Sequence, residues 1–368
     1  MRFVSSFLKK VLYPTLSAAG VFRRASAPGL AVVTYHGVVP RGYEFIDAAL
    51  DGNLVTAESL RQQLRLLKSN YRIISPEDAL AWRQDRFELP PRAVLLTCDD
   101  GLLNNLTEML PVLQQEEVRC LFFVTGASAE ETRSTLWYED LFLFFLRARA
   151  GVFAFSHAGI EIRGELRSRD QRLALWWDTV KRLSQVNAET RRAFVQNAGR
   201  ELSAAPTNSS MTESARERDS ALCRRFGLMT LAELRTLAAA GMTIGAHTMS
   251  HPMLSQMPAE LARAEIVECR AKLAAASQKD VWAFAYPFGD AASVTPRVLA
   301  MPEAAGYDAA FLNFGGGLGA DLPPYAMPRL HVTAEMRLSE FEAHVSGFHS
   351  RLQRSAGRSA PAFEPTAI

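Results

Sequence analysis

Short, continuous apolar runs recur along the chain, and polar clusters follow them. Runs of this kind are typical of strands buried on both faces, as in parallel sheets. They predict strands at 31–35, 92–98 and 121–124 and, after a long interruption, at 242–246, 281–286 and 308–312. Helical periodicity predicts helices at 57–68, in the segment up to 113, at 231–240 and at 259–276. The alternation indicates parallel βαβ units, an α/β class whose functional groups gather at the carboxyl ends of the strands.

The segment 127–226 has a different texture, with several tryptophans and many arginines. The βα pattern stops before this segment and resumes after it, and each part alone is incomplete. We therefore interpret the segment as a helical insertion into one domain, which forms a lid or cap. The predicted organisation is one α/β domain over 30–348, interrupted by this insertion. A flexible tail is expected at 349–368.

The first 29 residues predict a basic amphipathic helix with apolar residues at helical spacing. It could lie on a membrane surface through residues 1–24, or pack on the domain, and the pattern leaves both open. Pro14 and Gly20 interrupt it too early for a membrane span, and no clear signal-peptide cleavage site follows. The expected location is cytoplasmic or peripheral to a membrane.

Composition narrows the function classes. Of 368 residues 48% are apolar, which is ample for a core, and 41 basic against 39 acidic side chains give no overall field that would attract nucleic acid. The four cysteines show no CxxC pair, which argues against a zinc ribbon and is compatible with a reduced compartment.

Candidate chemistry lies directly after the predicted strands. Asp99 and Asp100 follow one strand, and His247 and His251 follow another. Adjacent carboxylates beside a buried strand are costly unless a cation compensates them. One carboxylate and two imidazoles can hold a divalent metal with positions left open, most simply zinc, although cobalt, nickel or manganese would fit. Singly, each motif is a common turn or a coincidence, but together at strand ends they favour a metal site.

These segments resemble the polysaccharide deacetylases, carbohydrate esterase family four, with a NodB homology domain. Thr97-Cys98-Asp99-Asp100-Gly101 is similar to the first motif, and His247-Thr248-Met249-Ser250-His251 to the second. Tyr35-His36-Gly37, Leu121-Phe122-Phe123-Val124 and Tyr286-Pro287-Phe288-Gly289 resemble further segments, the last typical of a Tyr-Pro-Phe-Gly subgroup. The resemblance covers residues 30–125 and 227–348. It implies a distorted (β/α)7-type TIM-like barrel and removal of N-acetyl groups from an N-acetylhexosamine of a polysaccharide, glycan or glycolipid.

The resemblance also implies roles by position. Asp100, His247 and His251 would be metal ligands and Asp99 the general base. The amide of Phe288 would contact the oxyanion, and His331 would be the general acid. The remaining candidates for substrate contact are Tyr286, His36 and Arg329.

The chain departs from the family pattern where Ala285 stands in place of an arginine that orients the catalytic aspartate. We hypothesise that Arg329 replaces that arginine in space. Because of this departure, a catalytically silent glycan-binding protein is an alternative. The same ligands could also serve an amidohydrolase that acts on a non-sugar amide.

Overall fold

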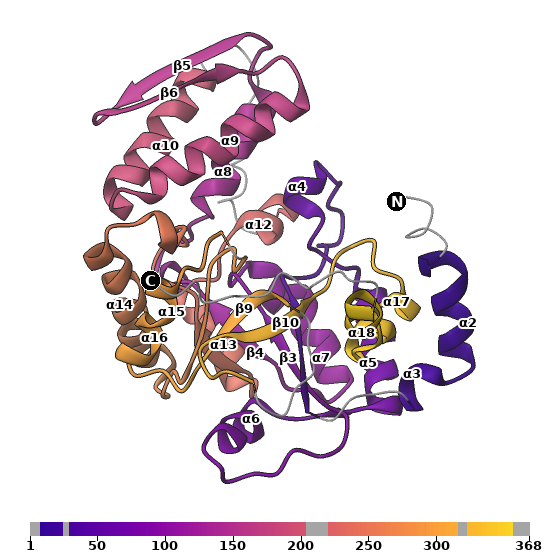
Figure 1. Ribbon diagram of the computed structural model, residues 1–368. Coiled ribbons are helices and arrows are strands. Elements are labelled where there is room, and N and C mark those ends of the chain that lie inside the picture. The colour runs from indigo at the N-terminus through magenta and orange to yellow at the C-terminus, as the bar shows by residue number, and fades with distance from the viewer. Residues whose placement is uncertain (1–7, 25–28, 204–219, 291, 316–321, 356–368) are drawn as a thin grey trace.

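The computed structural model describes residues 8–24, 29–203, 220–290, 292–315 and 322–355. Within them, seven parallel strands close into a barrel that helices surround (Figure 1). In chain order the barrel strands are β1 (Leu30–Tyr35), β3 (Ala93–Cys98), β4 (Leu121–Val124), β7 (Thr243–Ala246), β8 (Ala283–Ala285), β9 (Ala309–Gly315) and β10 (Met327–His331). The order around the barrel is β1-β10-β9-β8-β7-β4-β3, and β3 pairs with β1 to close it. The predicted (β/α)7-type barrel is confirmed.

Alternate side chains along each strand face opposite sides of the sheet, and they form two apolar cores. Val32, Leu95 and Phe123 belong to one apolar cluster, which lies inside the barrel. Their strand neighbours, such as Val33 and Leu96, belong to a second cluster that packs against the surrounding helices. Every residue of β1 and β3 is buried, because a closed parallel barrel is covered on both faces. The same alternation decides which strand-end side chains point into the barrel.

The barrel helices lie close to where periodicity predicted them, and capping groups define several of their starts. The Thr56 side chain accepts the N–H of Ser59 at the start of α5. The elements are α4 (Ala48–Asp51), α5 (Ala57–Asn70), α6 (Pro76–Arg83), η2 (Asn105–Met109), α7 (Leu110–Gln115), α13 (Leu231–Ala239), η4 (Leu254–Gln256), α14 (Ala259–Ser277), α15 (Pro296–Leu299) and α16 (Met301–Ala304). A two-residue strand, β2 (Arg72–Ile73), pairs with the start of β3 and is too short for a periodic signal.

Most of the segment between β4 and the barrel helix α13 forms a separate layer at one end of the barrel (Figure 1). Its elements are η3 (Gly126–Ala129), α8 (Trp137–Arg147), β5 (Val152–His157), β6 (Ile160–Glu165), α9 (Arg169–Ser184), α10 (Ala188–Ser203) and α12 (Ala221–Phe226). It has its own apolar core, which includes Phe142, Trp176 and Phe194. Because β4 pairs directly with β7, the chain leaves the barrel after β4 and returns to the adjacent position.

The expectation of an all-helical insertion is wrong at one place, the antiparallel hairpin of β5 and β6. Its turn residues, Ala158 and Gly159, both have positive φ, at 51° and 77°. This is the backbone that a two-residue hairpin requires, but Ala-Gly is not the usual Asn-Gly signal. The strands alternate between exposed and covered positions, so they present no continuous apolar run.

The N-terminal helices pack on the domain. They are η1 (Leu8–Leu12), α2 (Tyr13–Ala18) and α3 (Val21–Arg24), and they lie beside α17 (Leu338–Val345) and α18 (Phe348–Ser355). Tyr13 and Phe22 are fully buried with Ala343, and Lys9 forms an ion pair with Glu340 at 2.8 Å. Of the two interpretations of this segment, packing on the domain is therefore observed for residues 8–24. Among the described helices, none is both long and apolar enough to cross a membrane.

The predicted flexible tail, 349–368, begins with a helix. Residues 349–355 belong to α18, and the ring of His349 stacks on that of His344 with 4.0 Å between centroids. An amphipathic eight-residue helix at a chain end carries too weak a periodic signal to be predicted with confidence from sequence. Residues 356–368 lie outside the described residues.

Candidate active site

A cavity of about 350 Å³ lies at the carboxyl ends of the barrel strands. The barrel contributes most of the predicted site residues, namely His36, Asp99, Asp100, His247, His251, Tyr286, Phe288 and His331. The insertion contributes Tyr138, Glu139, Trp176, Trp177 and Arg225. The residues singled out in three distant sequence segments are thus brought to one place.

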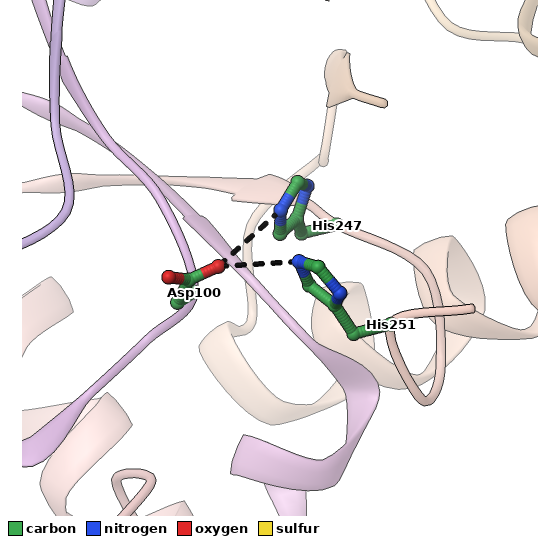
Figure 2. A group of neighbouring side chains, drawn as sticks. All are labelled: Asp100, His247 and His251. Atoms are coloured by element: carbon green, nitrogen blue, oxygen red, sulfur yellow. Dashed lines mark ion pairs between the residues drawn. The ribbon is translucent and has the colours of Figure 1, made fainter. Parts of the chain in front are cut away.

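Asp100, His247 and His251 all line the cavity, and their side chains point toward one another (Figure 2). The Nε2 atoms of His247 and His251 lie 3.5 Å and 3.3 Å from Oδ1 of Asp100, and all three side chains are buried. Two ligand atoms ~2.1 Å from one tetrahedral ion lie ~3.4 Å apart. One carboxylate oxygen and two imidazole nitrogens at this spacing fit a divalent metal of the zinc type.

Surrounding groups prepare these three side chains for a cation. Nδ1 of His247 donates to the carbonyl of Ala285 at 2.8 Å, which leaves Nε2 as the lone-pair atom facing Asp100. Burial acts to raise the pKa of Asp100, but its close contacts with the two imidazoles outweigh burial and hold the pKa well below its usual range. Burial lowers the pKa of His251, which favours the neutral, metal-binding form.

The backbone at the site is strained. Asp100, Thr248, His251 and Phe288 all have positive φ, between 55° and 78°, although none is a glycine. Such conformations persist only where the surroundings impose them, and they cluster at functional sites. Gly101 follows with φ 78°, and an added Cβ would meet Ser128 Oγ at 2.8 Å, so the turn after β3 needs a glycine there.

Asp99 lies beside the trio and is held by Arg329. Two parallel hydrogen bonds, 2.7 Å and 2.6 Å long, join the guanidinium to the carboxylate, and both side chains are buried. Arg329 also donates to the carbonyl of Leu312 at 2.7 Å and to Thr97 Oγ1 at 3.2 Å. Burial acts to raise the pKa of Asp99, but Arg329 and His247 lower it by a larger amount. The pKa therefore lies below its usual value, and the carboxylate is charged at neutral pH.

Strand alternation explains this contact. Met327 and Arg329 occupy inward positions of β10, whereas Leu330 packs outward. Ala285 occupies an inward position of β8, and its side chain carries no charge. Arg329 therefore enters the barrel interior from another strand and reaches Asp99, as the hypothesis of a spatial replacement requires.

His36 and His331 form a second imidazole pair in the cavity, with ring centroids 4.7 Å apart. Thr34 pairs with His331 in register, so β1 and β10 bring the two rings together. His36 Nδ1 and His331 Nε2 are buried and have no hydrogen-bond partner among the described residues. Burial, with a smaller effect of His36, lowers the pKa of His331 to about 3, so this imidazole is neutral at pH 7.

Phe288 and Tyr286 differ in what they offer a substrate. The ring of Phe288 packs against Trp177 and His251, and its amide forms no backbone hydrogen bond among the described residues. The Tyr286 hydroxyl, in contrast, donates to the carbonyl of Tyr325 at 2.9 Å, and its amide donates to Phe311. Strand alternation turns the Tyr286 side chain outward from the barrel interior, yet the residue lines the cavity, so its role as a substrate contact stays a prediction.

Sequence reasoning missed the polar groups that the insertion brings to the cavity wall. Arg225 pairs with Glu139 and with Asp51, at 2.8 Å in both cases, and all three are buried. Burial, with added repulsion from Asp100 and Asp51, raises the pKa of Glu139 to about 7 despite Arg225. An available signal was the pair Glu139-Asp140 inside an otherwise apolar helix, because buried carboxylates need a partner.

Asn313, at the end of β9, is another missed residue. It lines the cavity, and its Oδ1 is buried without a hydrogen-bond partner among the described residues. Together with one ring nitrogen each of His36, His251 and His331, it makes four buried polar atoms without a partner among the described residues that line the cavity. Buried polar groups are nearly always satisfied, so such atoms indicate a polar ligand or water.

The family model described as polysaccharide deacetylase matches residues 87–190 and 207–310, more than half of the chain. The match includes both Asp99-Asp100 and the two histidines of the trio. No curated protein matches the chain.

Solved structures share the fold at low sequence identity. A deacetylase of Streptococcus pyogenes, PplD in complex with acetate, is 14% identical with a TM-score of 0.53, over 86% of this chain and 98% of that one. IcaB from Ammonifex degensii is 17% identical with a TM-score of 0.52, over 87% and 98%. BC0361, a polysaccharide deacetylase from Bacillus cereus, is 14% identical with a TM-score of 0.50, over 86% and 69%. At these identities the likeness supports the barrel fold alone.

Proposed function

Because this chain belongs to the polysaccharide deacetylase family, we propose that it hydrolyses the N-acetyl group of an N-acetylhexosamine in a polysaccharide, glycan or glycolipid, using a divalent metal. The observation that carries this proposal is the buried trio of Asp100, His247 and His251, whose ligand atoms all lie within 4.8 Å of one another. Zinc suits this donor set best, and cobalt, nickel or manganese are compatible with it. A bound divalent ion would polarise the acetyl carbonyl and lower the pKa of water.

Asp99 is the proposed general base. Its carboxylate lies next to the trio and stays charged at neutral pH, so it can accept the proton of the attacking water. Arg329 fixes both carboxylate oxygens and so sets the direction of the lone pairs that remain. The segment Tyr286-Pro287-Phe288-Gly289, with Ala285 in place of the usual arginine, supports membership of the Tyr-Pro-Phe-Gly subgroup.

The remaining steps need a donor for the oxyanion and a proton for the leaving amine. The amide of Phe288 is a candidate for the first, since it has no described backbone partner. His331 is the candidate for the second. Because its pKa is lowered to about 3, it is neutral at pH 7, and the proton that it would pass to the amine is the one that Asp99 takes from the attacking water. The outcome is acetate and a free amine on the sugar.

The test compares bound metal and acetate release from N-acetylglucosamine oligomers for the wild type and two variants. Asp99→Asn should retain metal but lose roughly 10²–10⁴-fold in kcat, as expected for a general base. His247→Ala should lose both metal and activity. His157→Ala, on the hairpin of the insertion, is the control and should match the wild type. A wild type that binds no metal and releases no acetate from any N-acetylated glycan would contradict the proposal.

A further inference from the structure

The loop that carries the two histidines, residues 247–253, is fastened by the insertion. The indole N–H of Trp137, the first residue of α8, donates to the carbonyls of both Ser250 and His251, at 3.0 Å and 3.2 Å. Ser184, the last residue of α9, accepts the N–H of Met253 at 3.0 Å. Two insertion helices therefore hold the backbone on either side of a candidate metal ligand.

A third helix of the insertion reaches the same loop through a buried charge. Arg191, in α10, donates to the hydroxyl of Ser250 and lies 3.4 Å from Glu265 Oε1. Glu265 belongs to barrel helix α14, and its carboxylate accepts both the hydroxyl and, at 2.8 Å, the N–H of Ser250. The guanidinium also lies 5.1 Å from the ring centroid of Trp137. Ser250 is thus held between the insertion and the barrel.

The loop needs such support because its backbone is unfavourable by itself. Thr248 and His251 have φ of 64° and 55°, which a free loop rarely adopts. One bond within the loop, from the His251 N–H to Thr248 Oγ1 at 3.0 Å, stabilises this shape locally. The other bonds to Ser250, His251 and Met253 described above come from outside the loop.

We propose that Trp137 and Arg191 are positioning residues of the metal site, which hold the His251 loop so that its imidazole faces Asp100. The insertion is then part of the metal centre, in addition to forming a wall of the cavity. This inference rests on the proposed function only in taking the trio as a metal site. Partners that orient metal ligands typically affect metal affinity by 10–100-fold.

The experiment measures the Kd for Zn²⁺ of the full chain by competition with a chromophoric chelator. Trp137→Phe, which keeps a ring but removes the N–H, and Arg191→Ala should each weaken Zn²⁺ binding roughly 10–100-fold. The matched controls are Trp82→Phe, on α6, and Arg200→Ala, an exposed arginine of α10, and both should bind as the wild type does. Circular dichroism and the Tm without metal show whether each variant is folded.

A second readout is hydrogen exchange at the Ser250 amide in the absence of metal. It should accelerate in both variants, while exchange in the barrel strands stays unchanged. Arg191→Ala in a Ser250→Ala background should add little, because both remove the same contact. Should Arg191→Ala fail to fold, Trp137→Phe alone decides the question.

The experiment separates a failure of the positioning role from a failure of the proposed function. Folded variants with the Zn²⁺ affinity and Ser250 exchange of the wild type would overturn the positioning role while leaving the proposed function intact. A wild type that does not bind Zn²⁺ or another divalent ion would overturn the proposed function, and the exchange data would then still decide whether Trp137 and Arg191 order the loop.

Discussion

On the barrel side of the cavity, charged groups stand at strand ends and are fixed by buried hydrogen bonds, as with Asp99 and Arg329. On the insertion side, the wall consists of aromatic rings, including Tyr138 and Trp177, with one buried ion cluster around Arg225. The first arrangement suits chemistry, because fixed charges and ligands stabilise charge that develops in a reaction. The second suits recognition, because aromatic faces offer apolar area to a sugar ring. The proposed division is chemistry on the barrel, whose His251 loop the insertion helps to hold, and substrate selection on the aromatic wall of the insertion.

Removal of Arg329 should have the largest effect, because it removes the buried ion pair with Asp99 on the barrel side of the cavity. Arg329→Ala leaves the buried Asp99 without its charge partner, and we expect the free energy of unfolding to fall by about 3–5 kcal/mol. The pKa of Asp99 should rise, since burial still opposes its charge, and the acid limb of kcat/KM should move to higher pH. Denaturant unfolding and the pH profile of acetate release measure both effects.

Arg182→Ala is the control for this substitution. Arg182 belongs to an exposed ion pair with Asp178 on α9, and its loss should cost less than about 1 kcal/mol. Arg329→Lys, which keeps the charge but not the bidentate geometry, should recover stability only in part. An unchanged acid limb in Arg329→Ala would argue against the orienting role.

A change in the aromatic wall that the insertion presents to the cavity should alter substrate binding and not chemistry. Trp177 is half-buried, with its ring 5.7 Å from Phe288, whereas its neighbour Trp176 is buried and donates to the carbonyl of Tyr138. Trp177→Ala should raise KM roughly 2- to 10-fold, equivalent to ~0.5–1.5 kcal/mol of aromatic contact, with kcat unchanged. Steady-state kinetics on N-acetylglucosamine oligomers measure this split.

Trp82→Ala, on α6 away from the cavity, is the control for Trp177→Ala and should leave KM as it is. If Trp177→Ala lowered kcat and left KM unaltered, the insertion would take part in the chemistry and the division between the two sides would be incorrect.

The smallest expected effect is on the pH dependence of stability, through Glu139 on the insertion side of the cavity. The pKa of Glu139 is raised to about 7 in the folded chain by burial, above the 4.5 of an ordinary glutamate. The folded state therefore holds more protons, and this contribution to stability is fully present below pH 4.5 and lost as the pH rises through about 7. Glu139→Gln should remove the contribution and reduce the difference in Tm between pH 5 and pH 8 by a few degrees.

Glu161→Gln, on the exposed side of β6, controls for the loss of a carboxyl group and should keep the wild-type difference. A Glu139→Gln protein with the full wild-type difference in Tm would show that the pH dependence lies elsewhere.

Much of the barrel was predictable, for a physical reason. Parallel strands buried on both faces must be continuous apolar runs, and 121–124 was predicted with the bounds that β4 has. The hairpin β5–β6 was missed because half-exposed strands alternate and its turn lacks the usual residues. Alternation from Ala283 and Ala285 places the Tyr286 side chain on the outward face of β8's continuation, and its contact with a substrate stays a prediction.

Local sequence patterns were enough to predict an α/β class with parallel strands and to single out the residues of the trio, because motifs at strand ends are local and parallel strands end at a common edge; the barrel itself was implied by the family resemblance. Only the tertiary structure decided that Arg329 reaches Asp99, that Arg225 joins Glu139 and Asp51, and that Trp137 and Arg191 contact the loop of His251. These contacts join residues between 59 and 230 positions apart in the chain. A local sequence pattern does not identify such pairs. It indicates only that a buried charged residue needs a partner, and the packing of helices on the barrel determines which residue that is.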